Sequence, residues 1–351
     1  MPVCSHNDWD PLEEIVVGIA DHSQLPTLNK STHSFCYANE SWEDIKHLEG
    51  SHDHRIIDEA NEDLDRLSDE LRKLGVTVRR PLPQDHSVKF STPEWTTSGW
   101  YSYCPRDLLL PLDNMIIECP SPMRSRYFET RIYRDMLYEW MADGTKWISA
   151  PKPILADDGY QLENLDDPTL LNKEIVFDAP NIVRLGQDLL YQVSNSGNLL
   201  GYQWLKSIIG DKYRIHLAEK YYSFAHFDST VIPLRPGLVL FNGDRCTPDW
   251  YPPIFESWDK IFWPGDKVPD IGSNLAGGIS PCSKYIGLNL LSVNERLVIV
   301  DENQTELMKE LQRWGIESIG LPMRQSRTLS GGFHCVTLDV KRKGTLENYF
   351  T

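Results

Sequence analysis

Cys335 is the residue of this sequence best placed to act as a nucleophile. It closes the segment SGGFHC, in which Gly331 and Gly332 allow the backbone to approach a ligand closely or to adopt a positive φ. A cysteine in such a loop reacts when its surroundings favour the thiolate. A buried cysteine in a tight turn would have the same local sequence, so the groups around Cys335 must decide between the two interpretations.

His226, in the segment AHFD, is the candidate for general acid–base catalysis. On a strand, His226 and Asp228 would point to the same face, which favours an acid–base role over a structural one. Asp178, in FDAPN, is a candidate to orient His226, as the carboxylate of a nucleophile–base–carboxylate set does. His334 directly precedes Cys335, and adjacent residues of an extended segment point oppositely, so we predict a packing role for His334.

Asp107 and Asp228 suit the recognition of a planar cation beside a thiol and an imidazole. Guanidinium is such a cation, because carboxylates accept its fork of N–H donors in pairs. The same grip would hold the guanidinium carbon where a thiolate can attack it. Asp107 on its own, within Pro-Arg-Asp before a strand, would fit a turn residue.

A repeating unit must position these residues. It consists of an amphipathic helix, a turn and a short apolar strand, most clearly in EANEDLDRLSDELRKLGVTVRRP, where apolar residues recur every three or four positions before Gly75. Further copies are YRDMLYEWMADGTKWISAP, GYQWLKSIIGDKYRIHLA and TELMKELQRWGIESIGLPM, with a shorter one in PPIFESWDKIFWP. The copies begin near residues 58, 133, 201, 252 and 302.

An apolar, hairpin-like segment accompanies each copy. The five segments are DLLLPLDNMIIECP, NIVRLGQDLLYQV, STVIPLRPGLVLFN, YIGLNLLSVNERLVIVD and VTLDVKR. Five ββαβ units would each be too small to bury their faces alone, which favours a closed array over an ordinary α/β sheet. In a closed array the loops before the hairpins converge, and they carry, in order, Asp107, Asp178, His226 with Asp228, Ser283 and Cys335.

Composition narrows the function classes. The 351 residues carry a formal net charge of −16, which argues against nucleic acid and anionic membrane surfaces and mildly favours a cationic substrate, although acidity also aids solubility. The seven cysteines are scattered without a CxxC motif, so we expect neither a disulfide framework nor a metal site. With no apolar stretch of roughly 20 residues and no signal-like N-terminus, we expect a cytoplasmic protein.

The sequence resembles the arginine amidinotransferases over nearly its whole length. The motifs that carry the resemblance include GVTVRRP, YCPRD, RSRYFE, KWISAPKP, FDAPNIVR, HFDSTVIPLRPGLVL and SGGFHC. The streptomycin-type inosamine-phosphate enzymes look more similar than the vertebrate type, through LLYQVSNSGN and SRTLSGGFHC. The resemblance implies one domain over residues 1–351, a five-bladed α/β propeller with pseudo-fivefold ββαβ units.

The resemblance also implies roles for the site residues. Cys335 would be the nucleophile, His226 the acid–base group and Asp178 its partner, while Asp107 and Asp228 would grip the guanidinium. Ser283 and Arg245, in NGDR, match positions that bind the amino-acid end of the donor. The implied reaction is ping-pong: L-arginine transfers its amidino group to the thiol, ornithine leaves, and an amine collects the group, with no metal or organic cofactor.

Ala225, just before His226, bears on the acceptor amine. Glycine-using relatives have a bulkier residue and a longer loop there, so the short segment YYSFAH indicates a roomier site and an acceptor larger than glycine. An aminocyclitol phosphate and an amine intermediate of saxitoxin synthesis fit the most similar members of the family. A guanidine hydrolase such as arginine deiminase and a non-catalytic propeller that only binds ligands are the rival interpretations. The family leads us to expect a homodimer.

Overall fold

The computed structural model describes residues 2–163, 168–222 and 224–350, and five three-stranded sheets form its core. In each sheet an antiparallel pair is followed by a third strand parallel to the second. Four sheets are consecutive in sequence: β7 (Leu109–Leu112), β8 (Met115–Glu118), β9 (Lys146–Ser149); β10 (Ile182–Leu185), β11 (Asp188–Gln192), β12 (Arg214–Ala218); β13 (Val231–Arg235), β14 (Leu238–Asn242), β15 (Asp259–Trp263); β16 (Leu291–Asn294), β17 (Leu297–Asp301), β18 (Glu317–Leu321).

The fifth sheet closes the ring with strands from the two ends of the chain. It contains β19 (Thr337–Arg342), β1 (Leu12–Val17) and β4 (Thr77–Arg79) in that order. β19 is antiparallel to β1 and β1 is parallel to β4, so this sheet repeats the pattern of the other four. The sequence had placed a hairpin-like segment at residues 336–342, and the structure shows that its partner strand lies about 320 residues earlier.

Helices connect the second and third strands of four units. They are α3 (His54–Lys73), α4 (Arg134–Ala142), α5 (Leu199–Ile209) and α6 (Thr305–Arg313). α3 begins where the Asp53 side chain accepts the Arg55 backbone N–H, and it buries Leu64, Leu67 and Leu71 completely. It ends before Gly75, whose φ of +85° is the left-handed conformation expected of a residue that terminates a helix.

The prediction of a helix in the fourth unit, which begins near residue 252, is wrong. Residues 252–258 form only the 3-10 turn η7 (Pro253–Phe255) before β15. Only seven residues lie between Tyr251 and β15, which leaves room for one short turn and not for a helix of nine or more residues as in the other units. The strand predicted after it is confirmed.

Five apolar clusters show that the sheets form a closed ring. The first cluster joins β1 and β19 to β7 and β8, and the second joins β7 and β8 to β10 and β11. The third joins β10 and β11 to β13 and β14, and the fourth joins β13 and β14 to β17. The last joins β16–β17 back to β1 and also covers α3. Each sheet therefore packs against two neighbours, and the fold is the predicted five-bladed α/β propeller.

Buried charges fill the centre of this ring. Asp339 of β19 is fully buried and accepts hydrogen bonds from Arg106, Arg184 and Arg342, with both carboxylate oxygens 2.8 Å from Nη2 of Arg184. Arg342 also donates to the Ser292 carbonyl at 2.9 Å. Four of the five units thus meet in one hydrogen-bonded ion network, which offsets the cost of burying its charges only because its members pair with one another.

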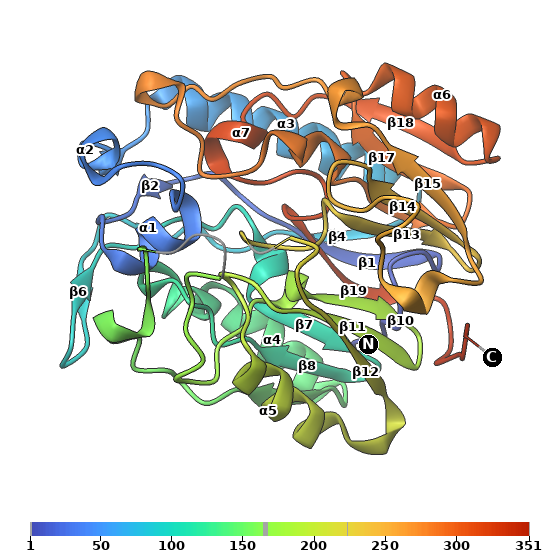
Figure 1. The fold of residues 1–351 in the computed structure, drawn as a ribbon, viewed down its shortest axis with the longest axis horizontal. Helices are drawn as coiled ribbons and strands as arrows, with labels where there is room; N and C mark the ends of the chain where they lie inside the picture. The colour runs from blue at the N-terminus through green and yellow to red at the C-terminus, as the bar shows by residue number, and fades with distance from the viewer. Residues whose placement is uncertain (1, 164–167, 223, 351) are drawn as a thin grey trace.

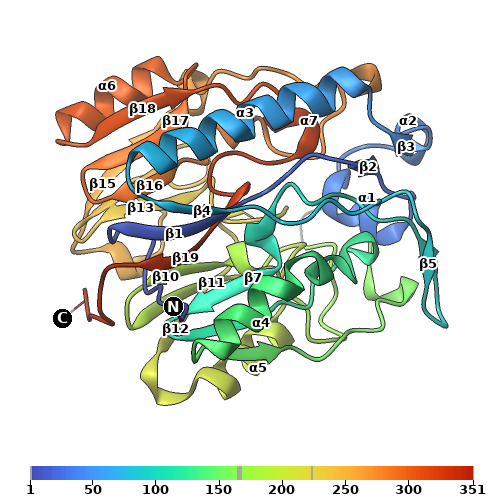
Figure 2. The same cartoon turned by 180° about the vertical axis from the view of Figure 1, so that it is seen from behind.

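Shorter elements gather on one side of the propeller. These are α1 (Lys30–Cys36), α2 (Trp42–Ile45), α7 (Ser326–Leu329), β2 (Gln24–Leu25), β3 (Gly50–Ser51), β5 (Phe90–Ser91) and β6 (Thr96–Thr97). In Figures 1 and 2 most of them lie at the end of the molecule away from the C-terminus, while α3 and α6 lie on one outer face and α4 and α5 on the opposite one.

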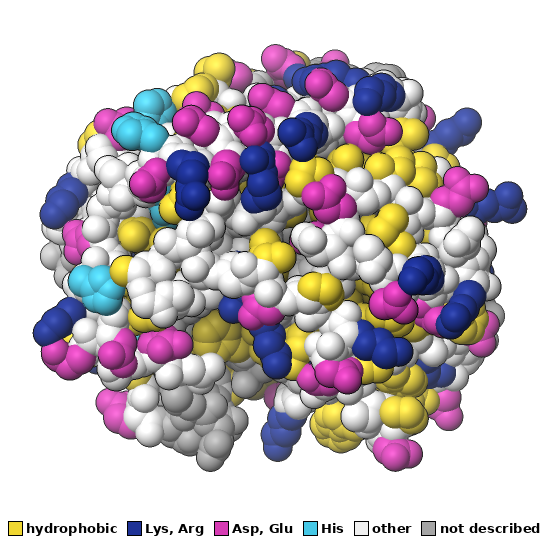
Figure 3. All heavy atoms as spheres, turned by 90° about the horizontal axis from the view of Figure 1, so that it is seen from above, with side chains coloured by type: hydrophobic (Ala, Val, Ile, Leu, Met, Phe, Trp, Pro, Cys, Tyr) yellow, Lys and Arg dark blue, Asp and Glu magenta, His cyan; other side chains and the backbone are white. Residues whose placement is uncertain are grey.

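The outer surface carries both signs of charge. On the face seen from above, Lys and Arg side chains lie among Asp and Glu (Figure 3). Pairs spaced three residues apart on the surface helices contribute to this pattern, such as Asp69 with Arg72 on α3 and Glu306 with Lys309 on α6. Within the part of the chain that the structure describes, no helix is long and apolar enough to span a membrane.

Candidate active site

The loops before the first strands of the five units converge, as the repeat predicted. Asp107 ends the 3-10 turn η1 (Pro105–Asp107) just before β7, and Asp178 precedes η5 (Ala179–Asn181) and β10. Ser283 precedes η10 (Lys284–Leu288) and β16, while Cys335 precedes β19 by two residues. Asp107, His226, Asp228, Ser283 and Cys335 all line one cavity of about 480 Å³.

Cys335 is held in a tight turn at the floor of this cavity. Its backbone N–H donates to Oδ1 of Asn289 at 3.0 Å. Neither glycine of the SGG segment has a positive φ; Ser330 does, at +60°. The glycines are needed for close packing instead, because a Cβ on Gly331 would lie 2.6 Å from the Cys104 sulfur.

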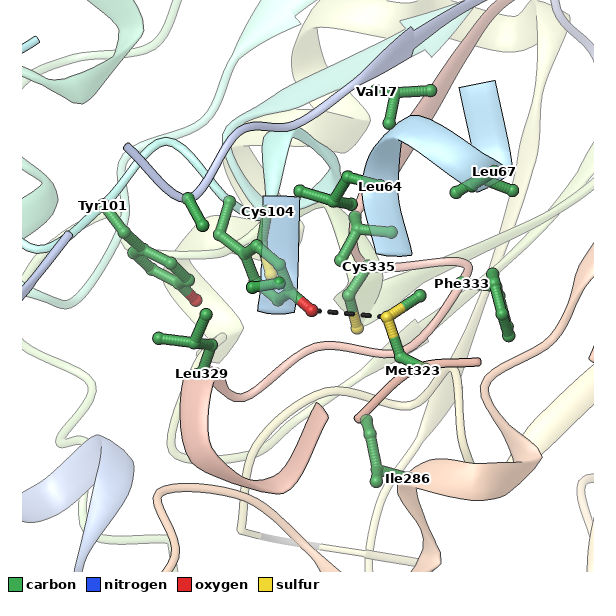
Figure 4. Packing of buried hydrophobic residues seen from close by; sticks show 14 of the residues in the cluster. Val17, Leu64, Leu67, Tyr101, Cys104, Ile286, Met323, Leu329, Phe333 and Cys335 are labelled. Carbon is green, nitrogen blue, oxygen red and sulfur yellow. Dashed lines mark hydrogen bonds between the residues drawn. The ribbon is translucent and has the colours of Figure 1, made fainter. Parts of the chain in front are cut away.

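The Cys335 side chain lies at the edge of an apolar cluster with one carboxylate beside it. Figure 4 shows it among buried side chains from α3, α7 and η10. Its Sγ lies 3.4 Å from Oδ2 of Asp228. Burial, and then the negative charge of Asp228, raise the pKa of the Cys335 thiol well above its usual range. The resting group is therefore a thiol that donates to Asp228, and a cation in the cavity would favour its ionisation.

His226 lies between two carboxylates. Its Nε2 is 3.0 Å from Oδ2 of Asp178, and its Nδ1 is 3.5 Å from Oδ1 of Asp107. Burial alone would lower the pKa of His226, but Asp107 and Asp178 together raise it to about 9. At neutral pH the ring is an imidazolium, prepared to donate a proton. Residues 224–228 form bends and a turn rather than a strand, yet His226 and Asp228 still face the same cavity.

One carboxylate oxygen of Asp107 is held by an arginine, and the other accepts no hydrogen bond from the described residues. Its Oδ2 accepts a short hydrogen bond from Arg126, a fully buried guanidinium that also pairs with Glu129 at 2.7 and 2.9 Å. Its Oδ1 is buried and accepts no hydrogen bond from the residues the structure describes. An unpaired carboxylate oxygen costs free energy unless a ligand supplies a donor. The prediction from sequence did not include Arg126 and Glu129, although both lie in the motif RSRYFE.

Arg245 contacts Ser283, which lines the cavity, but Arg245 itself lines a neighbouring chamber and not the cavity. Arg245 donates to the Ser283 hydroxyl at 2.6 Å and to the Thr230 hydroxyl at 2.7 Å, and its guanidinium stacks 3.4 Å from the ring centre of Tyr222. Its hydrogen bonds to described side chains go to hydroxyl groups and not to a carboxylate. A half-buried guanidinium held in this way can bind the carboxylate of a ligand by donating hydrogen bonds to it.

A second, outer chamber of about 870 Å³ adjoins the cavity. The two share Tyr222, Phe224, Cys282 and Ser283 as walls. Arg327, Glu40 and several hydroxyl groups line the outer chamber, so it is polar. Ala225 lines the inner cavity, where its small side chain leaves room beside His226.

The packing role predicted for His334 is wrong. Its Nδ1 lies 2.9 Å from Oδ2 of Asp228, the oxygen that faces the Cys335 thiol. Residues 333–336 form a turn, so the alternation of an extended segment does not apply and His334 and Cys335 reach the same carboxylate. Among the described side chains, no cluster of three or more His, Cys, Asp or Glu is placed to hold a metal ion.

Comparisons with known proteins identify relatives of the whole chain. No protein-family model matches the chain. It is 47% identical over 342 residues to inosamine-phosphate amidinotransferase 1 of Streptomyces griseus, which covers 97% of both chains. A solved structure of the inosamine-phosphate amidinotransferase from Streptomyces griseus superposes with a TM-score of 0.96 at 46% identity, covering 99% of each chain. An amidinotransferase of the saxitoxin biosynthetic pathway from Microseira wollei superposes with a TM-score of 0.89 at 36% identity, covering 100% of each.

More distant structures share only the fold. A dimethylarginine dimethylaminohydrolase from Pseudomonas aeruginosa superposes with a TM-score of 0.61 at 15% identity, over 93% of this chain and 99% of that one. The propeller therefore also occurs in hydrolases that act on guanidino groups, and the fold by itself does not distinguish transfer from hydrolysis.

Proposed function

The chain belongs to the amidinotransferase family, and on that premise we propose that it moves the amidino group of L-arginine to an amine through a covalent adduct on Cys335. The observation that carries the assignment of the site is the shared cavity of Cys335, His226, Asp228 and Asp107, whose Oδ1 accepts no hydrogen bond from the described residues and faces His226 at 3.5 Å. A guanidinium held by Asp107 and Asp228 would donate to that oxygen and would place its carbon beside the thiol.

In the first half-reaction the guanidinium cation favours ionisation of Cys335. The thiolate attacks the guanidino carbon, and a C–S bond forms. The imidazolium of His226 donates a proton to the departing nitrogen, the C–N bond breaks, and ornithine leaves. The thiol proton is released to solvent, so His226 is left as a neutral imidazole that can take a proton in the second half-reaction. A cationic amidino-thioether remains on Cys335.

The second half-reaction reverses these roles. An acceptor ammonium binds in the cavity that ornithine has left and loses a proton to His226. The neutral amine attacks the amidino carbon, a C–N bond forms, and the C–S bond breaks. The guanidinylated product leaves and Cys335 regains its proton.

Incubation with arginine in the absence of an acceptor tests the proposal. We expect a mass increase of one amidino group on the peptide that contains Cys335, together with release of ornithine, and discharge of the adduct when a suitable amine is added. Citrulline and ammonia as the main products would assign the protein to the hydrolases, and a protein that merely binds arginine would give no adduct.

The Arg245→Gln variant should bind arginine more weakly. Loss of a charge-assisted contact with the donor carboxylate should raise KM for arginine about 10- to 100-fold with a smaller effect on kcat. Agmatine, which is arginine without the carboxylate, is the control substrate: the variant and the wild type should use it equally poorly. An unchanged KM for arginine, measured from ornithine release, would assign the carboxylate to another group.

The outer chamber supports an acceptor larger than glycine. It is polar, it opens beside the cavity, and it combines Arg245 and Arg327 with the hydroxyl groups of Tyr37, Ser280 and Tyr285. We propose a polyhydroxylated or phosphorylated amine such as an aminocyclitol phosphate, the acceptor class in the name of the Streptomyces relatives; an amine of the kind used in the saxitoxin pathway is the alternative.

A homodimer in the cytoplasm, without nucleic acid or membrane partners, stays a prediction from the sequence and the resemblance.

A further inference from the structure

His334 links the nucleophile to the ion network at the centre of the propeller. We propose that His334 is a positioning residue that holds Oδ2 of Asp228 against the Cys335 sulfur and supplies it with a positive charge. The inference rests on the proposed roles of Cys335 and Asp228, and it concerns a side chain that contacts neither the donor cavity nor the reacting carbon.

The first observation is that Asp228 depends on a partner for its orientation. It lies in a turn rather than in a strand, so the backbone ladder does not fix its direction. Its Oδ2 lies 2.9 Å from Nδ1 of His334 and 3.4 Å from Sγ of Cys335. A His334 N–H therefore holds the oxygen that receives the thiol proton, while Asn289 interacts with the same carboxylate.

The second observation is that His334 is itself anchored from behind. Its Nε2 lies 3.8 Å from Oδ1 of Asp8, which pairs with Arg184 of the central network. Two further cavities are both lined by Asp8 and His334, and one of them is also lined by Asp228. The imidazole thus bridges two carboxylates, one facing the thiol and one facing the network.

The charges around His334 decide when it is protonated. Asp228 and Asp8 face it from two loops, and Arg106 faces it from η1. Burial and Arg106 lower the pKa of His334, but the hydrogen bonds to the two carboxylates outweigh them and raise it. Burial alone would raise the pKa of Asp228, whereas His334, together with His226 and Asn289, lowers it to about 2. A protonated His334 therefore keeps Asp228 ionised and reduces the repulsion that a thiolate on Cys335 would meet.

Alkylation of Cys335 by iodoacetamide tests this role without arginine or turnover. In the His334→Gln variant we expect alkylation about tenfold slower than in wild type near pH 6, because the thiolate loses a positive neighbour worth about one pKa unit. The two rates should converge as the pH rises through the raised pKa of His334, because the wild-type imidazole then becomes neutral. His6→Asn, which changes another buried histidine away from the cavity, is the matched control and should follow wild type.

His334→Asn separates the hydrogen bond from the charge. Its amide N–H takes the place of Nδ1, so it should recover most of an expected loss of about 100-fold in kcat/KM for arginine, while its alkylation stays as slow near pH 6 as that of His334→Gln. Alkylation profiles of both variants that match His6→Asn at every pH would overturn the proposal. Absence of an amidino adduct in wild type would refute the proposed function but would leave the alkylation result intact.

Discussion

The Cys335→Ala variant should form no amidino adduct and should release ornithine about 10,000-fold more slowly than wild type, or not at all. The sulfur is the atom on which the amidino group rests between the two half-reactions, and no rearrangement of His226 or Asp228 can replace it. Intact-protein mass spectrometry after incubation with arginine measures the adduct, and ornithine release measures turnover.

Cys246→Ala is the matched control for this experiment. It also removes a buried thiol, but Cys246 lies in the apolar cluster between β10–β11 and β13–β14, and it does not line the cavity. It should retain the adduct and turnover. An adduct that persists in Cys335→Ala, for instance on Cys282 in the cavity wall, would contradict the assignment of the nucleophile.

The His226→Asn variant should lose about 100- to 10,000-fold in kcat, the usual contribution of a positioned acid–base group. Asparagine keeps a donor near one ring position but cannot give a proton to the departing nitrogen. The pKa of His226 also predicts the pH above which kcat/KM of the wild type declines. Its pKa is raised to about 9, so the acidic form is present below that value and is lost above it, and kcat/KM for arginine should fall as pH rises through about 9.

Asp178→Asn tests the source of this limit. The variant removes a carboxylate 3.0 Å from the ring, so the pKa of His226 should fall and the decline in kcat/KM should begin at least about one pH unit lower. His216→Asn, a surface histidine paired with Asp188, serves as the control with an unchanged profile. An alkaline limit that does not move in Asp178→Asn would mean that another group supplies the proton.

Local patterns predicted most of the propeller. The period of apolar residues in α3 and α6 and the glycines after them depend only on neighbours in sequence, and they located the units correctly. The partner of β19 could not be found in this way, because pairing between chain ends leaves no local signal. In the fourth unit, the apolar spacing indicated a helix, but the structure forms only a 3-10 turn in the seven residues between Tyr251 and β15.

In the active site, too, the residues that follow the local repeat were predicted, and their partners from distant parts of the chain were not. The repeat placed Cys335, His226 and the carboxylates at equivalent positions, and the structure brings them to one cavity. The residues that hold them escaped prediction. Arg126 holds Asp107 from 19 residues away, and His334 holds Asp228 from 106 residues away. Neither separation corresponds to a known sequence motif, so the pairs could not be predicted from the sequence.

The closure of the ring by β19 has a consequence for how the enzyme is made. A nascent chain leaves the ribosome with β1 long before β19, so until the final stage of synthesis one edge of β1 has no strand beside it. Cys335 lies two residues before β19 and emerges at the same moment. A translation product interrupted before residue 335 therefore has neither a closed propeller nor the proposed nucleophile, and by the proposed mechanism it cannot consume arginine.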